Sequence, residues 1–133
     1  MVRRIAGGLV ALLWVAIARG ADVDFERQIV PILVRHCAAC HNSSDPAGGL
    51  DLLSADTALA GGESGSPAIV PGDAQQSNLL ERIRAHEMPP EGKADPVSDE
   101  DVSRLEKWIQ AGAHWPAGRV LTSLEFTTDA RAG

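Results

Sequence analysis

The sequence predicts a small all-α domain, with three or four main helices separated by long loops. Three segments repeat apolar residues at three- and four-residue spacing, which is the pattern of an amphipathic helix. Residues 42–72 are rich in Gly, Ser, Pro and Asp, which favours loops over regular structure. The 133 residues of the chain leave room for one such domain.

The first expected helix covers residues 24–36, with Asp24 as a candidate N-cap. Pro31 lies inside it and removes one backbone hydrogen bond, so we expect a kink or a late start there. One face of this helix carries Phe25, Ile29, Ile32, Leu33 and His36.

A short helix is expected at residues 55–60, capped by Ser54 and ended by Gly61. Loop regions as long as the one around it are uncommon in compact domains unless something organises them. The apolar residues expected to face inward here are Leu50, Leu52, Leu53, Leu59, Ile69 and Val70.

Two further helices are expected downstream. Asp73 as N-cap, with Gln76 three residues later, predicts a helix that runs to about Ala85. Ser98 caps the clearest helix of the chain, and Gly112 is well placed to end it. The apolar face of this last helix consists of Val102, Leu105, Trp108 and Ile109.

The two ends of the chain are not expected to belong to the domain. Residues 1–20 combine early arginines, an apolar run and small residues at their end, which predicts a cleaved signal peptide and export to the periplasm or the extracellular space. The apolar run is shorter than the roughly 20 residues of a membrane span, so an uncleaved anchor is the weaker alternative. We assign residues 21–116 to the domain and residues 117–133 to a C-terminal tail or the start of a linker.

The net charge of the chain limits the kinds of molecule that it is expected to bind. Without residues 1–20 the chain has nine basic and eighteen acidic residues, a net charge of −9. Nucleic acids and anionic membranes favour proteins of the opposite sign, so neither is an expected partner. The acidic surface favours partners that present a basic docking patch.

The only two cysteines stand in the motif Cys37-Ala38-Ala39-Cys40-His41. Two thiols at this spacing can form thioether bonds to a haem, and the histidine after them is then a ligand of the iron. Cys37 and Cys40 are therefore candidate haem attachment sites, and His41 is the candidate proximal ligand. A thioredoxin-like pair should follow a strand, a zinc site needs further ligands, and a structural dithiol is the remaining alternative.

Met88 is the candidate distal ligand of the iron. It is the only methionine after the signal segment, and it lies directly before Pro89 and Pro90 in a loop that is a poor place for a core residue. His86 is the alternative ligand and would give a bis-histidine site.

Other ionisable residues have weaker assignments. His36 is expected to pack beside the motif, and His114 is expected on the surface. Arg82 and Arg84 are candidate partners for haem propionates, although an exposed helix face explains them equally well. No pair of acidic residues points to acid–base catalysis.

Together the motif, the Met-Pro-Pro loop and the flanking helices make the chain resemble class I cytochromes c, and more narrowly the planctomycete-type cytochrome c domain. The resemblance covers about residues 24–116 and rests on the segments ERQIVPILVRHCAACH, GGLDLLSADTALAGGESGSPAIVPGDAQQSNLLERI, HEMPPEGK and LEKWIQAGAHWP. It implies a small class I cytochrome c fold around one covalent haem c, with crossing first and last helices and Phe25 near Trp108. It also implies that a loop carbonyl accepts the ring N–H of His41, with Pro46 and Ala47 as candidates.

The resemblance implies an electron carrier and not an enzyme: a mono-haem domain that exchanges single electrons with redox proteins. One alternative is a peroxidatic or gas-sensing domain in which Met88 leaves the iron. Another is an interaction domain without haem. Domains of this family commonly stand at the front of longer secreted proteins, so further domains of a longer chain are expected.

Overall fold

The structure of the chain is a computed structural model that describes residues 22–122 and Glu125. The predicted signal peptide and most of the predicted tail lie outside these residues. The described part contains six helical elements, and one isolated bridge, between Ser54 and Val120, is its only β-pairing. The elements are η1 (Phe25–Ile29), α1 (Val30–His36), η2 (Ala47–Gly49), α2 (Ala55–Ala60), α3 (Asn78–Arg84) and α4 (Asp99–Gln110). This composition agrees with the predicted all-α class.

The first predicted helix is present, but it begins with a wider turn. Asp24 caps it and accepts a hydrogen bond from the backbone N–H of Arg27 at 3.0 Å. Phe25–Ile29 is a π-helix, and the regular α-helix begins at Val30, directly before Pro31. Proline has no N–H to donate, and the sequence therefore predicted a kink or a late start at this point. The structure has a late start, because the wider π-helical turn comes before the regular helix.

Three aromatic residues join the two ends of the domain. The ring of Phe25 lies 5.8 Å from that of Trp108 and 4.7 Å from that of Trp115, measured between centroids. The indole N–H of Trp108, buried in α4, donates to the carbonyl of His114 at 2.8 Å. The contact of Phe25 with Trp108, which the family resemblance implied, is therefore present.

The predicted start of α3 at Asp73 is wrong, because α3 begins at Asn78. The carboxylate of Asp73 accepts hydrogen bonds from Gln75 and Gln76 and so closes a turn instead of capping a helix. Ser77 is 1 % exposed, and its hydroxyl group bonds to the backbone of Val70 and Asp73. These bonds hold residues 70–77 in a bend, and the helix begins only after it.

The short helix α2 has the predicted bounds, with Ser54 as its cap and Gly61 at its end. Of the residues expected to face inward, Leu52, Leu53 and Ile69 are buried. Leu59 is the error, because 47 % of it is exposed and Ala58 is the buried residue of α2. The helix is too short to bury more than one face.

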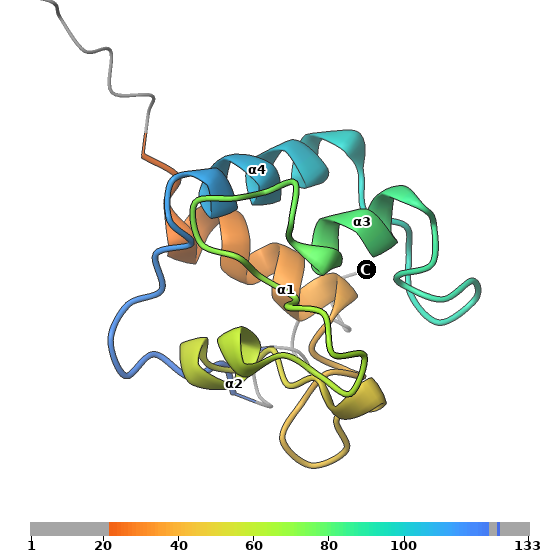
Figure 1. Cartoon of the computed structure of the whole chain (residues 1–133). Coiled ribbons are helices and arrows are strands. Elements are labelled where there is room, and N and C mark those ends of the chain that lie inside the picture. Colours follow the sequence, from red (N-terminus) through yellow and green to blue (C-terminus); the bar gives the residue numbers. More distant parts are fainter. Residues whose placement is uncertain (1–21, 123–124, 126–133) are drawn as a thin grey trace, which may run out of the picture.

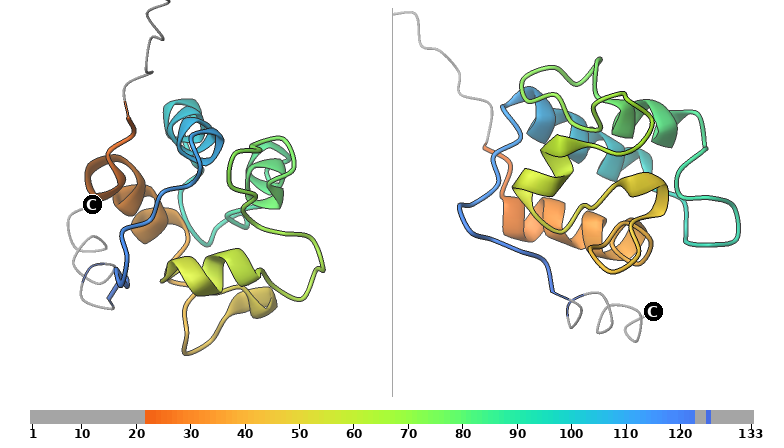
Figure 2. Two further views of the ribbon diagram at one scale, coloured as in Figure 1. Left: turned by 60° about the vertical axis from the view of Figure 1, so that its left-hand side comes forward. Right: turned by 60° about the horizontal axis from the view of Figure 1, so that its bottom comes forward.

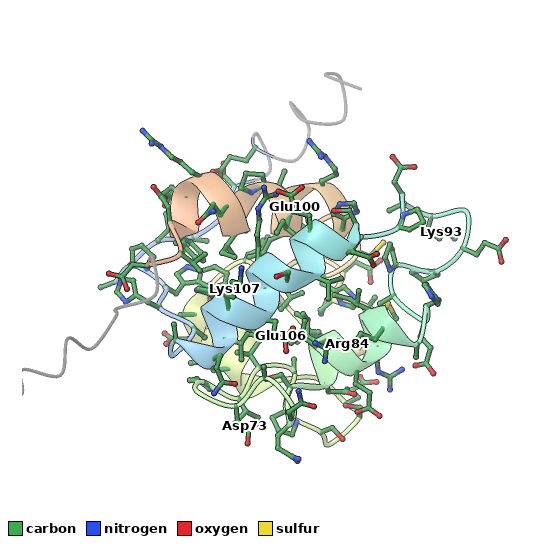
Figure 3. The ribbon with its side chains drawn as sticks, turned by 90° about the horizontal axis from the view of Figure 1, so that it is seen from above. Asp73, Arg84, Lys93, Glu100, Glu106 and Lys107 are labelled. Atoms are coloured by element: carbon green, nitrogen blue, oxygen red, sulfur yellow. The ribbon has the colours of Figure 1, made fainter. Side chains whose placement is uncertain are left out.

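Helices α1, α3 and α4 lie together on one side of the domain (Figures 1 and 2). Figure 1 shows α1 and α4 crossing, with α3 beside them, and the left view of Figure 2 shows α4 between α1 and α3, with α2 on the opposite side. The guanidinium of Arg84 on α3 lies 3.0 Å from the carboxylate of Glu106 on α4, and the two side chains face each other in Figure 3. No helix in the described part of the chain has the length and apolar character to cross a membrane.

The chain continues to pack on the domain beyond Pro116. Leu121 is 1 % exposed, and its N–H donates to the carbonyl of Leu53 at 2.8 Å. The indole N–H of Trp115 donates to the carbonyl of Arg119 at 2.8 Å. The predicted domain boundary at residue 116 stays a prediction, and residues 119–121 make contacts with the body of the domain.

Candidate functional site

The end of α1 places the cysteine motif. The N–H groups of Cys37 and Ala38 both bond to the carbonyl of Leu33, and Ala38 is fully buried. The N–H groups of Cys40 and His41 then both bond to the carbonyl of Cys37, at 3.2 and 3.0 Å. This single turn brings both thiols and the imidazole close together, and all three side chains line one cavity.

The motif and Met88 lie on the wall of one cavity of about 850 Å³. The volume falls within the roughly 300–1,000 Å³ of pockets that hold small molecules and cofactors. The four predicted site residues Cys37, Cys40, His41 and Met88 all line it. Most of the remaining wall is apolar, with Leu50, Leu52, Leu79, Ile83 and Val97 among its residues. Two sulfurs for covalent attachment, two axial ligand types and an apolar wall fit a haem.

The imidazole of His41 is oriented by the backbone. Its Nδ1 lies 3.2 Å from the carbonyl oxygen of Leu50, so Nδ1 carries the proton and Nε2 is left to bind a metal. The expectation of Pro46 or Ala47 as the acceptor is therefore wrong. Their carbonyls accept the N–H groups of Gly49 and Leu50 in η2, and the carbonyl of Leu50 is the one that reaches the ring.

Met88 follows a tight turn at the end of α3. The N–H groups of Glu87 and Met88 both bond to the carbonyl of Arg82, at 2.9 and 3.2 Å, so the chain folds back over the last turn of the helix. Met88 is half-buried and packs against the hydrophobic core. His86 is exposed and is not among the residues that line the cavity.

The two candidate propionate partners differ in position. Arg82 lines the cavity and forms an ion pair with Glu87 at 3.1 Å. Arg84 does not line it, since its guanidinium pairs with Glu106. The structure thus separates two arginines that the sequence left equivalent.

Burial, and then the neighbouring Cys40, raises the pKa of the Cys37 thiol to about 12. The thiol is neutral at physiological pH, and a thioether at the same position would carry no charge either. Within the described residues no group of three or more His, Cys, Asp and Glu side chains is arranged to hold a metal ion, so the zinc alternative gains no support.

Sequence reasoning missed one polar contact at the cavity. Nδ1 of His36 lies 2.8 Å from the carbonyl oxygen of Asp95, and both residues line the cavity. No sequence signal marks this pair, because the acceptor is a backbone group 59 residues away.

Residues 37–92 match the family model described as Planctomycete cytochrome C. This part of the chain is similar to a planctomycete-type cytochrome c domain. The matched span begins at Cys37 and includes Cys40, His41 and Met88, so the recognition made from the sequence is confirmed. A cytochrome c domain implies a haem c, in agreement with the donor set of the cavity.

The chain is also similar to the alpha subunit of hydrazine synthase from Kuenenia stuttgartiensis. The two are 29% identical in a match that covers 70% of this chain. The same match covers 15% of the length of that subunit. No solved structure matches the chain significantly.

Proposed function

We propose that this planctomycete-type cytochrome c domain is an exported mono-haem electron carrier, with His41 and Met88 as the axial ligands. One observation carries the proposal. The cysteine motif and Met88, far apart in sequence, line the same cavity, whereas His86 lies outside it. Met88 is therefore better placed than His86 as the second ligand.

Each site residue has a defined task. Cys37 and Cys40 would hold the macrocycle by thioether bonds, and the hydrogen bond from Nδ1 of His41 to the carbonyl of Leu50 would leave Nε2 free to bind the iron. The thioether of Met88 would be the second ligand of the iron and would favour the reduced metal relative to a second imidazole. When bound, the haem supplies exchange of one electron at its iron.

A carrier needs no ligand to leave, and the site fits that requirement. The loop that bears Met88 is fixed to α3 through the carbonyl of Arg82. A second function, in which Met88 leaves and the iron takes a peroxide or a diatomic gas, draws support from the similarity to a subunit of hydrazine synthase. Carbon monoxide separates the two, because rapid binding to the reduced protein favours the second function.

The setting of the domain is part of the proposal. The net charge of −9 without residues 1–20 supports a redox partner with a basic docking patch. The signal-like start supports export, to the periplasm or beyond the cell. A match to 15% of a longer relative supports further domains that work with this one.

The optical spectrum of the matured protein tests the ligation. We expect Met88→Ala to abolish the far-red band that a thioether–ferric iron bond gives, and His86→Ala to retain it. Loss of the band in His86→Ala, with retention in Met88→Ala, contradicts the assignment. A protein without a pyridine haemochrome spectrum contradicts the haem itself and supports an interaction domain.

A further inference from the structure

The segment after Met88 is an exposed loop that borders the cavity. Residues 89–97 contain no buried residue, and they project past α3 in Figure 1 and in the right view of Figure 2, with Lys93 at the edge of the molecule in Figure 3. The segment has an internal turn, in which the N–H of Lys93 donates to the carbonyl of Pro90 at 3.0 Å. This turn shapes the loop but does not attach it to the rest of the domain.

His36 attaches this loop to the helix that bears the cysteine motif. It is the last residue of α1 and the neighbour of Cys37. Its Nδ1 donates to the carbonyl oxygen of Asp95 at 2.8 Å, across 59 residues of sequence. The bond therefore joins the loop after Met88, the proposed distal ligand, to the end of α1, which leads into the cysteine motif and His41, the proposed proximal ligand.

We infer that His36 is a positioning residue that holds the 89–97 loop closed and thereby limits how readily Met88 leaves the iron. The inference rests on the proposed His41 and Met88 ligation. With Asp95 fixed, the chain between Met88 and its next anchor is shorter, and a shorter span has less conformational freedom to open. Beyond Asp95, Val97 packs against the hydrophobic core and Ser98 caps α4.

Two substitutions of His36 distinguish a role in hydrogen bonding from a role in packing. Leucine keeps the apolar bulk of His36 but removes the donor, whereas the side-chain amide of asparagine presents an N–H near the position of Nδ1. If His36 serves only as a packing residue, leucine is the better replacement. If it holds the loop by its hydrogen bond, asparagine is the better one.

The test is binding of added imidazole to the ferric haem protein, followed by loss of the far-red band. Opening of the Met88 loop must precede binding, so the apparent affinity reports the open fraction. We expect His36→Leu to bind imidazole about fivefold more tightly, the change that loss of one hydrogen bond of ~1 kcal/mol gives. We expect His36→Asn to stay within about twofold of the parent protein.

The exposed His114 supplies the control, and we expect His114→Leu to leave the affinity unchanged. His36→Ala gives a second donor-free variant should His36→Leu fold poorly. Parent-like affinity in a donor-free variant that keeps the band overturns the inference and leaves the ligation intact. Absence of the band from the parent protein overturns both the ligation and this inference.

Discussion

At the scale of single residues, the site depends on backbone geometry as much as on side chains. The ring of His41 is oriented by a carbonyl, and the turn that leads to Met88 passes through His86 with a φ of 58°. That left-handed conformation is strained for any residue with a Cβ and is free of strain for glycine. His86 thus occupies a position where the backbone, and not its imidazole, has the structural role.

This strain leads to a prediction for His86→Gly. We expect the change to raise the free energy of unfolding of the haem protein by up to ~1 kcal/mol, because it relieves the left-handed strain at that residue. The far-red band should remain. Denaturation in urea measures the stability, and Ala85→Gly is the control, since Ala85 has a φ of −77° and should lose ~0.5–1 kcal/mol. A destabilised His86→Gly protein would show that the imidazole itself has a role.

At the scale of elements, the backbone of residues 61–63 packs so closely against η2 that Gly62 has no room for a side chain. The N–H of Glu63 donates to the carbonyl of Gly48 at 2.8 Å, which joins residues 61–63 to η2. A Cβ added to Gly62 would lie 2.5 Å from that same carbonyl oxygen. Because Leu50 follows directly and orients His41, this contact lies next to the candidate iron ligand.

We therefore expect Gly62→Ala to cost ~1–3 kcal/mol in the free energy of unfolding, since backbone must shift to admit the methyl group. It should also change the reduction potential, because the carbonyl of Leu50 moves relative to His41. Gly65→Ala is the matched change in the same loop, with a φ of 76° and open space around it. It should cost stability through its backbone conformation alone and leave the potential unchanged. Equal shifts of potential in both variants would contradict this explanation.

Helix ends show how far the sequence predicts these elements. Ser54 and Ser98 each accept a hydrogen bond within the first turn of the helix that they cap, so local chemistry alone fixed α2 and the start of α4. Asp73 carries the same local signal, yet it closes a turn, because Ser77 ties that segment to Val70. The second case depends on a tertiary contact, which a local pattern does not contain.

In the candidate site, too, the local sequence predicted some features, whereas the tertiary fold determined others. Residue type and spacing identified Cys37, Cys40, His41 and Met88, all of which line the cavity. The sequence did not identify the acceptor at Leu50, because every residue has a carbonyl and only the fold of the loop selects one. The bond between His36 and Asp95 was missed for the same reason.

For the whole molecule, ion pairs at the surface join the two ends of the described chain. Arg119 donates to Glu26 at the start of η1 and to Glu125 beyond the last buried residue, Leu121. The side chain of Arg119 is 24% exposed, and the hydrogen bonds to both carboxylates raise the pKa of its guanidinium. The segment after Pro116 is thereby held against the first helix by charge as well as by the burial of Leu121.

This arrangement predicts a pH dependence. The hydrogen bonds from Arg119, with smaller contributions from Thr122, lower the pKa of Glu125 to about 2. A carboxyl with a depressed folded-state pKa stabilises the fold above its unfolded pKa of about 4.3, and the contribution is lost as pH falls from there toward 2. We expect Glu125→Gln to cost ~1 kcal/mol at pH 7, the upper range for a partly exposed pair, and the cost to fall toward zero as the pH drops through about 2. Urea denaturation of both proteins across this range measures it, with Glu91→Gln in the exposed 89–97 loop as a control that should change little. A cost that persists unchanged at pH 2 would mean that the carboxylate charge is not what holds this segment.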